Sequence, residues 1–417
     1  MRESLALVPS FLLHSEFSVP HSILAMLLGI NYADPNRFGW DFGLPPKTLA
    51  GHPFAGPNWA GPPGADGETP FLKVLRTYRV HGLEIVRFPI LGDAWNYGSP
   101  TSVWDGQDWV WRFTPPSTLD PSFLHDFELL LQTFRKTDGI RLMPVLISFE
   151  AFQKGKLVLN SEEVTLDGSP PPTKGVSLED YIAGRYLIAN ESTPVGGKTR
   201  LDPEFSTDYH SFIKGGKADI VLNKQTRRAF MEQVLQPFLE MAAEYREQIY
   251  AFDLCNEPDM LTGEIPQKHL IRFLQEGCET IARYGVSSTV GFQRFDVMVK
   301  WAEQLQVALA QFHYYPELSL FGIGVPELPE LDGGCLGEFA TSDINPETGQ
   351  EWPGWPGSQM RGRPRLRDRL RMIEEKKFAS ALLWSDNAGD VCSRWDSQTW
   401  SEIGAYLEGS RENGSPA

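Results

Sequence analysis

Two glutamates stand at the ends of apolar segments, where their side chains have the chemistry of paired acids. Glu257 follows the apolar run 249–256 in an Asn-Glu-Pro sequence, and Glu338 lies in Gly-Glu-Phe near the end of the run 334–339. A carboxyl at the rim of an apolar core is costly to ionise unless it is paired, so its pKa is raised toward the range of a general acid. Cleavage of a glycosidic bond uses one protonated and one ionised carboxyl, and retaining enzymes hold them about 5–5.5 Å apart.

Eight apolar runs, mostly followed by helical patterns, must position these residues. The runs are continuous, which is typical of parallel strands covered on both faces. Helices between them begin at proline and end before glycine, and one long helix is predicted over 225–248. This order predicts a single (β/α)8 barrel; a doubly wound open sheet is the alternative, but no GxGxxG follows the first run. The predicted strands are Ile23–Asn31, Leu83–Ile90, Ile140–Phe149, Ile249–Asn256, Ser287–Phe292, Val307–Tyr314, Gly334–Phe339 and Phe378–Ser385.

The barrel brings the two glutamates together, because its fourth and seventh strands face each other across the mouth. Each glutamate alone has a simpler interpretation. Glu257 is also suited to cap the next helix, and Glu338 to pair with a lysine or arginine. Their occurrence together at facing strand ends favours a catalytic pair.

The length of the chain is expected to lie in loops of one barrel. Of the 417 residues, we assign 1–22 to an N-terminal extension, 23–408 to the barrel and 409–417 to a flexible tail. Long loops are predicted after strands one, two, three and seven, on the face where such barrels carry their sites. The insertion 153–223 after strand three is expected to hold some structure of its own, as a lid or subdomain.

The Asn-Glu-Pro and Gly-Glu-Phe sequences at these strand ends resemble those of clan A retaining glycoside hydrolases, and more closely glycoside hydrolase family 5, the cellulase and mannanase group. The resemblance covers nearly the whole barrel but is specific only at the strand ends. It implies that Glu257 is the acid/base, that Glu338 is the nucleophile and that Asn256 bonds the sugar 2-hydroxyl. Such chemistry needs neither a metal nor an organic cofactor, and no metal-binding motif stands out.

Other strand-end residues match the same family. Arg87 corresponds to its strand-two arginine, which bonds the nucleophile and keeps it ionised, although a structural ion pair is the alternative. His313 and Tyr315 correspond to its His-x-Tyr, with the tyrosine orienting the nucleophile and the histidine bonding substrate or the acid/base. Trp384 corresponds to its sugar-stacking platform, with core packing as the alternative.

One family residue, the histidine near the end of strand three, is missing. Ser148 or Glu150 is expected to occupy its space, and Glu150 either binds a sugar hydroxyl or forms a salt bridge. The subfamily is therefore open, as is a distinct clan A family. Asn31 at the end of strand one is expected to help line the glycone end of the cleft, together with Tyr32, Trp40 and Asp41.

Tryptophans gather in the loops after strands two, seven and eight. Aromatic faces stack on the apolar faces of sugar rings, so about half of these side chains are expected to contact a carbohydrate, while the others hold long loops in place. They are Trp95, Trp104, Trp109, Trp111, Trp352, Trp355 and Trp395.

Composition excludes other classes. The net charge of −16, from 38 basic and 54 acidic residues, repels phosphate backbones and argues against a nucleic-acid partner. No apolar run reaches the roughly 18 residues of a membrane span, and no convincing signal peptide is present, so a cytoplasmic protein is expected unless a misplaced start hides an export signal. The chain has four cysteines and no CxxC pair, which predicts free thiols; they are Cys255, Cys278, Cys335 and Cys392.

The sequence thus predicts a retaining β-glycosidase acting on gluco- or manno-configured glycosides or oligo- and polysaccharides. Three alternatives remain: a transglycosidase with the same two glutamates, a non-catalytic carbohydrate-binding barrel, and a metal-dependent barrel hydrolase. Leu28-Gly-Ile-Asn-Tyr32 resembles the start of β-mannanase-like proteins, which makes mannan the first polysaccharide to test. The oligomeric state is not predicted.

Overall fold

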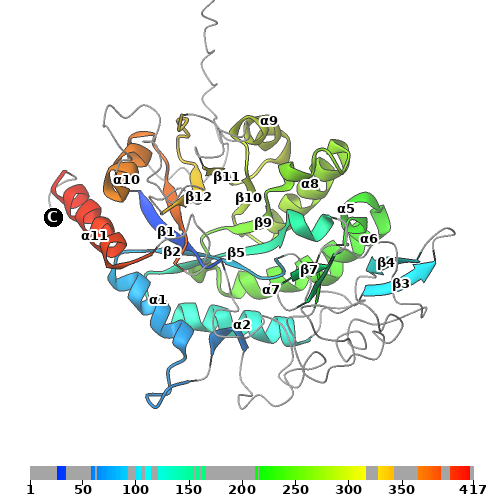
Figure 1. Ribbon diagram of the computed structural model, residues 1–417, viewed down its shortest axis with the longest axis horizontal. Coiled ribbons are helices and arrows are strands. Elements are labelled where there is room, and N and C mark those ends of the chain that lie inside the picture. The colour runs from blue at the N-terminus through cyan, green and yellow to red at the C-terminus, as the bar shows by residue number, and fades with distance from the viewer. Residues whose placement is uncertain are drawn as a thin grey trace, which may run out of the picture.

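The computed structural model describes residues 26–33, 58–61, 63–92, 100–104, 109–113, 121–153, 156–159, 162–164, 212–214, 216–315, 327–341, 365–386 and 395–413. Within them, eight parallel strands close into a barrel in the order β1-β13-β12-β11-β10-β9-β5-β2, which confirms the predicted (β/α)8 fold (Figure 1). The barrel strands are β1 (Leu27–Asn31), β2 (Ile85–Pro89), β5 (Arg141–Ser148), β9 (Phe252–Asn256), β10 (Ser288–Phe292), β11 (Leu309–Tyr314), β12 (Cys335–Ala340) and β13 (Ser380–Trp384).

Helices surround the barrel strands (Figure 1). The first helix has the end signals that the sequence indicated. Thr69 Oγ1 accepts a hydrogen bond from the Leu72 N–H, and proline occupies the first helical position. Gly82, just after the helix, has a φ of +80°. The helices are α1 (Pro70–Val80), α2 (Pro121–Arg135), α5 (Asp219–Leu222), α6 (Lys224–Phe230), α7 (Gln236–Glu244), α8 (Gln267–Arg283), α9 (Phe295–Leu305), α10 (Leu366–Glu375) and α11 (Ser397–Asn413), with short 3-10 turns at Asn58–Ala60, Phe149–Phe152, Arg246–Gln248 and Pro258–Leu261.

Two helix predictions need correction. The segment 225–248 is not one α-helix, because a π-turn at Met231–Leu235 separates α6 from α7. Pro237 lies two residues after this turn; it has no N–H for the carbonyl four residues earlier, and its ring crowds that carbonyl, so the backbone widens there. The expected tail at 409–417 begins too early, since α11 continues to Asn413. The helix contains Gly409, and one glycine in a helix costs only about 1 kcal/mol.

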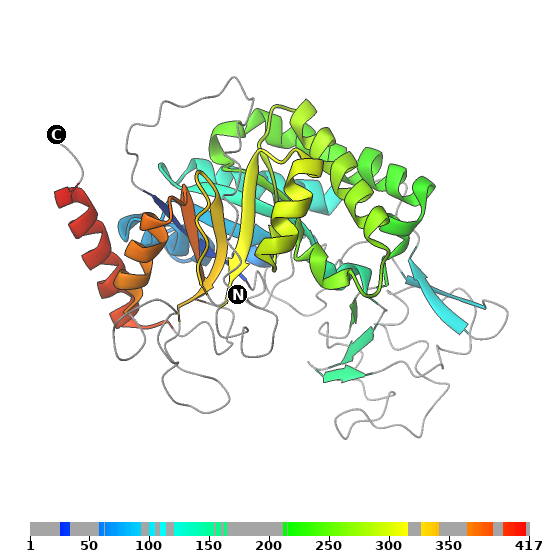
Figure 2. The same ribbon diagram turned by 90° about the horizontal axis from the view of Figure 1, so that it is seen from above.

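Two small sheets lie in the long connections. β3 (Pro100–Trp104) and β4 (Trp109–Phe113) form an antiparallel hairpin after β2. β6 (Lys156–Leu159), β7 (Glu162–Val164) and β8 (Phe212–Lys214) form a sheet in the order β7-β6-β8 within the insertion after β5. Figures 1 and 2 place both sheets on the same side of the barrel.

Some predictions fall outside the described residues. These are the extension 1–22, most of the insertion 153–223, and the side chains of Trp40, Asp41, Trp95, Trp104, Trp109, Trp111, Trp352, Trp355 and Cys392. Among the described residues no helix is long and apolar enough to cross a membrane. Cys255, Cys278 and Cys335 are buried free thiols, as predicted.

The barrel interior is apolar at one level and polar above it. Five buried residues from neighbouring strands form the apolar level: Ile85, Met143, Ala251, Cys335 and Leu382. Side chains alternate along a strand, so the residue two positions further on points inward again, nearer the carboxyl end. In β2 and β9 those next inward residues are Arg87 and Asp253, both buried. The strand register therefore places charged groups below the mouth of the barrel.

Candidate active site

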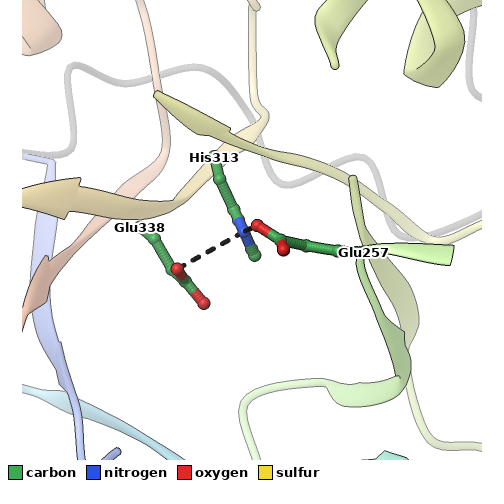
Figure 3. A group of neighbouring side chains, drawn as sticks. All are labelled: Glu257, His313 and Glu338. Atoms are coloured by element: carbon green, nitrogen blue, oxygen red, sulfur yellow. Dashed lines mark hydrogen bonds and ion pairs between the residues drawn. The ribbon is translucent and has the colours of Figure 1, made fainter. Parts of the chain in front are cut away.

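Glu257 and Glu338 meet at the carboxyl end of the barrel. Glu257 follows β9 and Glu338 lies in β12, and their side chains point toward each other with His313 of β11 between them (Figure 3). One oxygen of each carboxylate and one nitrogen of the imidazole all lie within 4.8 Å of one another. The pair is shielded from water, since their side chains are only 15% and 7% exposed.

Irregular strand pairing turns the decisive residues inward. Where β9 pairs with β10, Asp253 lies opposite Thr289 and Asn256 opposite Gly291, so β9 has one extra residue between the two pairs. Where β12 pairs with β11, Leu336 lies opposite Phe312 and Glu338 opposite His313, so β12 also has one extra residue. Such bulges change which face a side chain points to and are frequent at barrel rims beside active sites. They bring Asn256 and Glu338 into the same inner level as Arg87.

The backbone of Glu257 is strained. It has φ 49° and ψ 45°, the left-handed region, although it is not glycine. Its N–H donates to the Gly291 carbonyl at 2.6 Å, which holds this conformation. Its side chain makes no capping hydrogen bond to the 3-10 turn that follows, so the helix-cap interpretation is wrong. A strained backbone costs about 1–3 kcal/mol and is concentrated at functional sites.

Glu338 is held at both oxygens. Arg87 Nη1 donates to Oε1 at 2.6 Å, and the Tyr315 hydroxyl donates to Oε2 at 3.0 Å. Both bonds favour the ionised carboxylate and fix its orientation. Arg87 also bonds a second carboxylate, so its two sequence interpretations, as ion pair and as partner of Glu338, hold at once.

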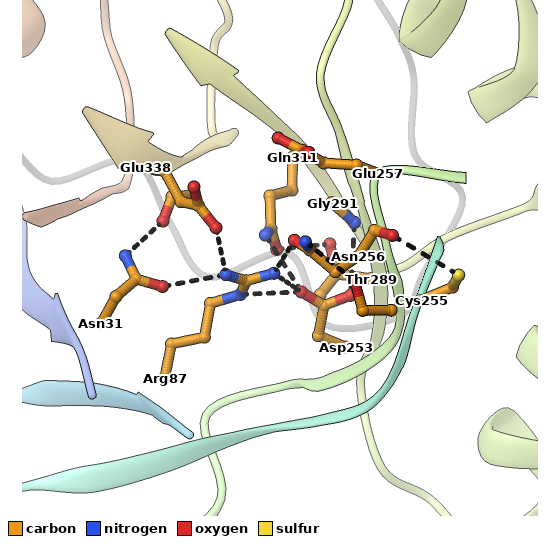
Figure 4. A network of polar contacts seen from close by, with 12 residues as sticks. Asn31, Arg87, Asp253, Cys255, Asn256, Glu257, Thr289, Gly291, Gln311 and Glu338 are labelled. Carbon is orange, nitrogen blue, oxygen red and sulfur yellow. Dashed lines mark hydrogen bonds and ion pairs between the residues drawn. The ribbon is translucent and has the colours of Figure 1, made fainter. Parts of the chain in front are cut away.

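That second carboxylate, Asp253, was not singled out in the sequence. Arg87 donates to Asp253 Oδ2 from Nε at 2.9 Å, and its Nη2 lies 2.9 Å from the same oxygen (Figure 4). Gln311, also missed, donates to Asp253 Oδ2 at 3.2 Å. The available signal was a charged or amide residue at an inward position of an otherwise apolar run.

His313 contacts both glutamates through one nitrogen. Its Nδ1 lies 2.7 Å from Glu257 Oε1 and 3.4 Å from Glu338 Oε2. Its Nε2 faces Gly291 and has no hydrogen-bond partner among the described residues. A Cβ at Gly291 would lie 2.9 Å from that nitrogen and from Gln311 Nε2, so only glycine fits there. Burial lowers the pKa of His313 to about 4, so the imidazole is neutral near neutral pH.

The two glutamates differ in how strongly their charge is supported. Burial, and next the negative charge of Glu150, raise the pKa of Glu257 to about 7. Burial also raises the pKa of Glu338; His313, Arg87 and Tyr315 oppose that rise, and the charge of Glu257 adds to it. Hydrogen bonds from Arg87 and Tyr315 support the ionised form of Glu338, and Glu257 has neither of them.

Asn256 connects this centre to the space of the missing histidine. Its Oδ1 accepts from Arg87 Nη2 at 2.6 Å, and its Nδ2 donates to Ser148 Oγ at 3.4 Å. The Ser148 hydroxyl donates to Glu150. Arg87 thus fixes the amide so that a second Nδ2 proton remains for a ligand. Within the described part of the chain Glu150 pairs with no lysine or arginine, and its role as a sugar ligand or ion-pair partner stays a prediction.

Several weaker predictions change. Asn31 is 1% exposed and accepts from Arg87 Nη1 at 2.9 Å, so it supports the arginine and does not line the cleft. Tyr32 is fully buried against Phe88, because the residue after an inward Asn31 points outward. Trp395 packs against Trp400, with ring centroids 4.9 Å apart. Trp384 is half-buried at the end of β13, and its stacking role stays a prediction.

Two kinds of chemistry are open to this arrangement. A protonated and an ionised carboxyl facing each other can carry out general acid and nucleophilic catalysis. Glu257, His313 and Glu338 also offer ligand atoms close enough for a divalent cation. The buried Arg87 beside Glu338 already supplies positive charge at this place, which fits the first arrangement more closely.

Comparison with known proteins adds the following. No protein-family model matches the chain, and no curated protein matches its sequence. Solved structures similar to it include a β-1,4-mannanase from the sea hare Aplysia kurodai, with 14% identity, coverage of 94% of this chain and 95% of that one, and a TM-score of 0.44. GH5_18 from Bifidobacterium longum, in complex with Manβ1-4GlcNAc, has 12% identity, coverage of 94% and 80%, and a TM-score of 0.48. Endo-glycoceramidase II from Rhodococcus has 14% identity, coverage of 91% and 79%, and a TM-score of 0.43.

The barrel and the polar centre at its mouth define a (β/α)8 protein with a paired-carboxylate site.

Proposed function

We propose that the protein is a retaining β-glycoside hydrolase that acts on gluco- or manno-configured substrates. The observation that carries this proposal is the facing pair Glu257 and Glu338: burial raises the pKa of Glu257 to about 7, and Arg87 and Tyr315 donate hydrogen bonds to Glu338. A carboxylate oxygen of Glu257 lies within 4.8 Å of a carboxylate oxygen of Glu338. This fits the spacing of retaining enzymes, about 5–5.5 Å, and not the roughly 6.5–9.5 Å that inverting enzymes need to admit a water.

The reaction would proceed in two displacements. Glu338 attacks the anomeric carbon while Glu257 gives its proton to the glycosidic oxygen, so the aglycone leaves as an alcohol and a glycosyl ester forms on Glu338. Glu257, now ionised, takes a proton from an incoming water, and the resulting hydroxide attacks the anomeric carbon. The ester bond breaks, the sugar leaves, and Glu257 is protonated again.

The supporting residues have roles that follow from their contacts. Arg87 and Tyr315 hold Glu338 ionised and in one orientation for attack. The free Nδ2 proton of Asn256 is placed to bond a substrate hydroxyl near the reacting carbon. His313, neutral at the working pH, keeps the Glu257 carboxyl directed into the site at 2.7 Å. Positioning of this kind converts binding energy into rate.

A screen of aryl β-glycosides and polysaccharides, mannan first, tests the proposal. Wild-type protein should release the aryl group from at least one β-glycoside, and proton NMR should show the β-anomer as the first free sugar. The variant Glu338→Gln serves as the matched control. Activity on no β-glycoside, or release of the α-anomer first, would contradict the proposal.

Two further experiments, with a chelator and with acceptor sugars, separate the alternative functions. Activity that survives a chelator removes the metal-dependent hydrolase. Added acceptor sugars separate hydrolysis from transglycosylation, because a transglycosidase makes elongated products in preference to free sugar. A carbohydrate-binding barrel without catalysis would bind sugar and release nothing.

The pH dependence of kcat/KM should be bell-shaped with its maximum on the acidic side of neutrality. As pH rises through about 7, Glu257 loses the proton it must donate, so activity falls about tenfold per pH unit. As pH falls through the pKa of Glu338, which lies above the ordinary 4.5, the nucleophile is protonated and activity falls again. A substrate whose leaving group needs no protonation, such as a dinitrophenyl glycoside, is the control and should lose the alkaline limb. Activity still rising between pH 7 and 9 would contradict these roles.

The substitution Glu150→Gln should move the alkaline limb to lower pH. Removal of a negative charge near Glu257 makes its ionised form less costly, so the pKa of Glu257 falls from about 7. The expected shift is about half a pH unit, because Glu150 is only part of the cause. An unmoved alkaline limb in a variant of wild-type thermal stability would show that Glu150 does not influence the acid.

A further inference from the structure

Asp253 is the most deeply buried charge in the active-site region. Its side chain is fully buried, so no substrate reaches it. Its Oδ2 contacts Arg87 Nε and Nη2, each at 2.9 Å, and accepts from Gln311 Nε2 at 3.2 Å. Its Oδ1 accepts from the Gly291 N–H at 3.2 Å. The Gln311 amide oxygen lies 3.1 Å from Thr289 Oγ1, whose hydroxyl donates to the Leu309 carbonyl at 2.7 Å (Figure 4).

Arg87 has no free donor left. A guanidinium has five N–H groups. In this structure Nε serves Asp253, Nη1 serves Asn31 and Glu338, and Nη2 serves Asn256 and Asp253; the contacts are 2.6–2.9 Å long. One buried cation therefore lies between two buried carboxylates, and its charge is shared between them.

We propose that Asp253 is a positioning residue that sets the basicity of the nucleophile: it takes up part of the charge of Arg87 and so keeps Glu338 a stronger base than the arginine alone would allow. This inference rests on the proposed glycosidase function. A purely structural role would be different, because Asp253 would then only hold Arg87 in place against Glu338. The two roles predict shifts of opposite sign when the Asp253 charge is removed.

The other titratable groups that face Glu338 are the same in wild type and in variants at Asp253. Arg87 of β2, His313 and Tyr315 near β11, and Glu257 after β9 face the carboxylate, and β1 and β13 contain no titratable side chain. Two further carboxyls lie near Glu257 in the described part of the chain: Glu150 after β5, whose charge raises the pKa of Glu257, and Asp259 in the 3-10 turn after β9, which accepts from the Gln293 and Arg294 N–H groups.

The thiols near Asp253 remain neutral in the same pH range. Burial raises the pKa of Cys255 well above its usual value, and those of Cys278 and Cys335 to about 12. Burial raises the pKa of Asp259, two residues after Glu257, to about 6, so this carboxyl titrates in the same range as the two glutamates, in wild type and in the Asp253 variants alike.

The test compares wild type with Asp253→Asn and Asp253→Ser. The asparagine keeps the shape of Asp253 but turns N–H donors toward Arg87, whereas the serine leaves space for water. The two substitutions therefore disturb folding in different ways, so a shift that both variants share comes from the lost charge. The readouts are the acid limb of kcat/KM on an activated aryl β-glycoside and the pH dependence of inactivation by a 2-deoxy-2-fluoro glycoside. Both report the ionisation of Glu338.

Removal of the Asp253 charge should leave more of the Arg87 charge to Glu338. The acid limb should then move down by about one pH unit, and kcat at the optimum should fall about tenfold because a weaker base is a weaker nucleophile. The alkaline limb should move less, since Arg87 does not bond Glu257. An acid limb that stays in place or moves up overturns the inference, as does loss of the native fold in both variants.

The matched control is Glu276→Gln. Glu276 also pairs with a buried arginine, Arg227, at 2.9 Å, but on helices outside the barrel. This variant should keep the wild-type acid limb. If wild type cleaves no β-glycoside, the proposed function falls and this inference with it; if wild type is active and only the Asp253 shift is absent, the proposed function stands and this inference fails.

Discussion

Replacement of Glu338 by glycine should lower kcat on aryl β-glycosides by at least about 10⁴-fold, because no group remains to form the covalent intermediate. The fold should survive, since Arg87 keeps its ion pair with Asp253 at 2.9 Å when Glu338 is gone. Thermal unfolding and steady-state kinetics on the same preparation check both statements. Glu330→Gln, a change at an exposed glutamate paired with Lys377, is the control and should behave as wild type.

Chemical rescue makes the Glu338 prediction specific. In Glu338→Gly, azide can enter the space of the missing carboxylate and attack the anomeric carbon from the same face. The bond to the aryl group breaks, Glu257 protonates the leaving oxygen where needed, and an α-glycosyl azide is released. Near wild-type kcat without azide would remove Glu338 from the mechanism, and rescue that yields only the β-azide would place the nucleophile elsewhere.

Replacement of Glu257 by alanine should have an effect that depends on the leaving group. An alkoxide is a poor leaving group without a proton, so kcat/KM on alkyl glycosides or oligosaccharides should fall by about 10³-fold. A dinitrophenolate leaves unaided, so its glycoside should still form the glycosyl-enzyme at nearly the wild-type rate. Single-turnover kinetics with a series of aryl leaving groups measures this as a steeper dependence of rate on leaving-group pKa.

The second step gives Glu257 a signature of its own. Without a base to activate water, the glycosyl-enzyme of Glu257→Ala should accumulate, and azide should release it as a β-glycosyl azide. The pH profile should lose its alkaline limb near pH 7, where the pKa of Glu257 lies. Equal loss of rate on good and poor leaving groups would contradict the acid role.

Local sequence patterns predicted most of the fold and the site residues at the strand ends. Continuous apolar runs placed all eight barrel strands, and polar residues at their ends placed Arg87, His313 and the two glutamates. Proline and glycine gave the helix ends, except at Pro237, where a π-turn inside a helical pattern has no distinctive sequence signal. Tyr32 was misplaced because its direction depends on which face of β1 points inward.

The parts that the sequence did not reveal depend on long-range geometry. The bulges in β9 and β12 arise from pairing with β10 and β11, and no local pattern predicts an extra residue in a strand. The left-handed backbone of Glu257 is held by the Gly291 carbonyl. Asp253 and Gln311 stood inside runs interpreted only as apolar strands, and their importance appears when Arg87 is seen to contact both carboxylates.

We propose that Glu338 forms a covalent bond to the sugar during turnover. Incubation with a 2-deoxy-2-fluoro-β-glycoside that carries a good leaving group should inactivate the enzyme, because the fluorine slows the second step more than an activated first step. The mass of the protein should increase by one fluoroglycosyl group, and peptide mapping should place it on Glu338. A label on Glu257 or elsewhere, or no label on an enzyme that turns over the parent glycoside, would contradict the account.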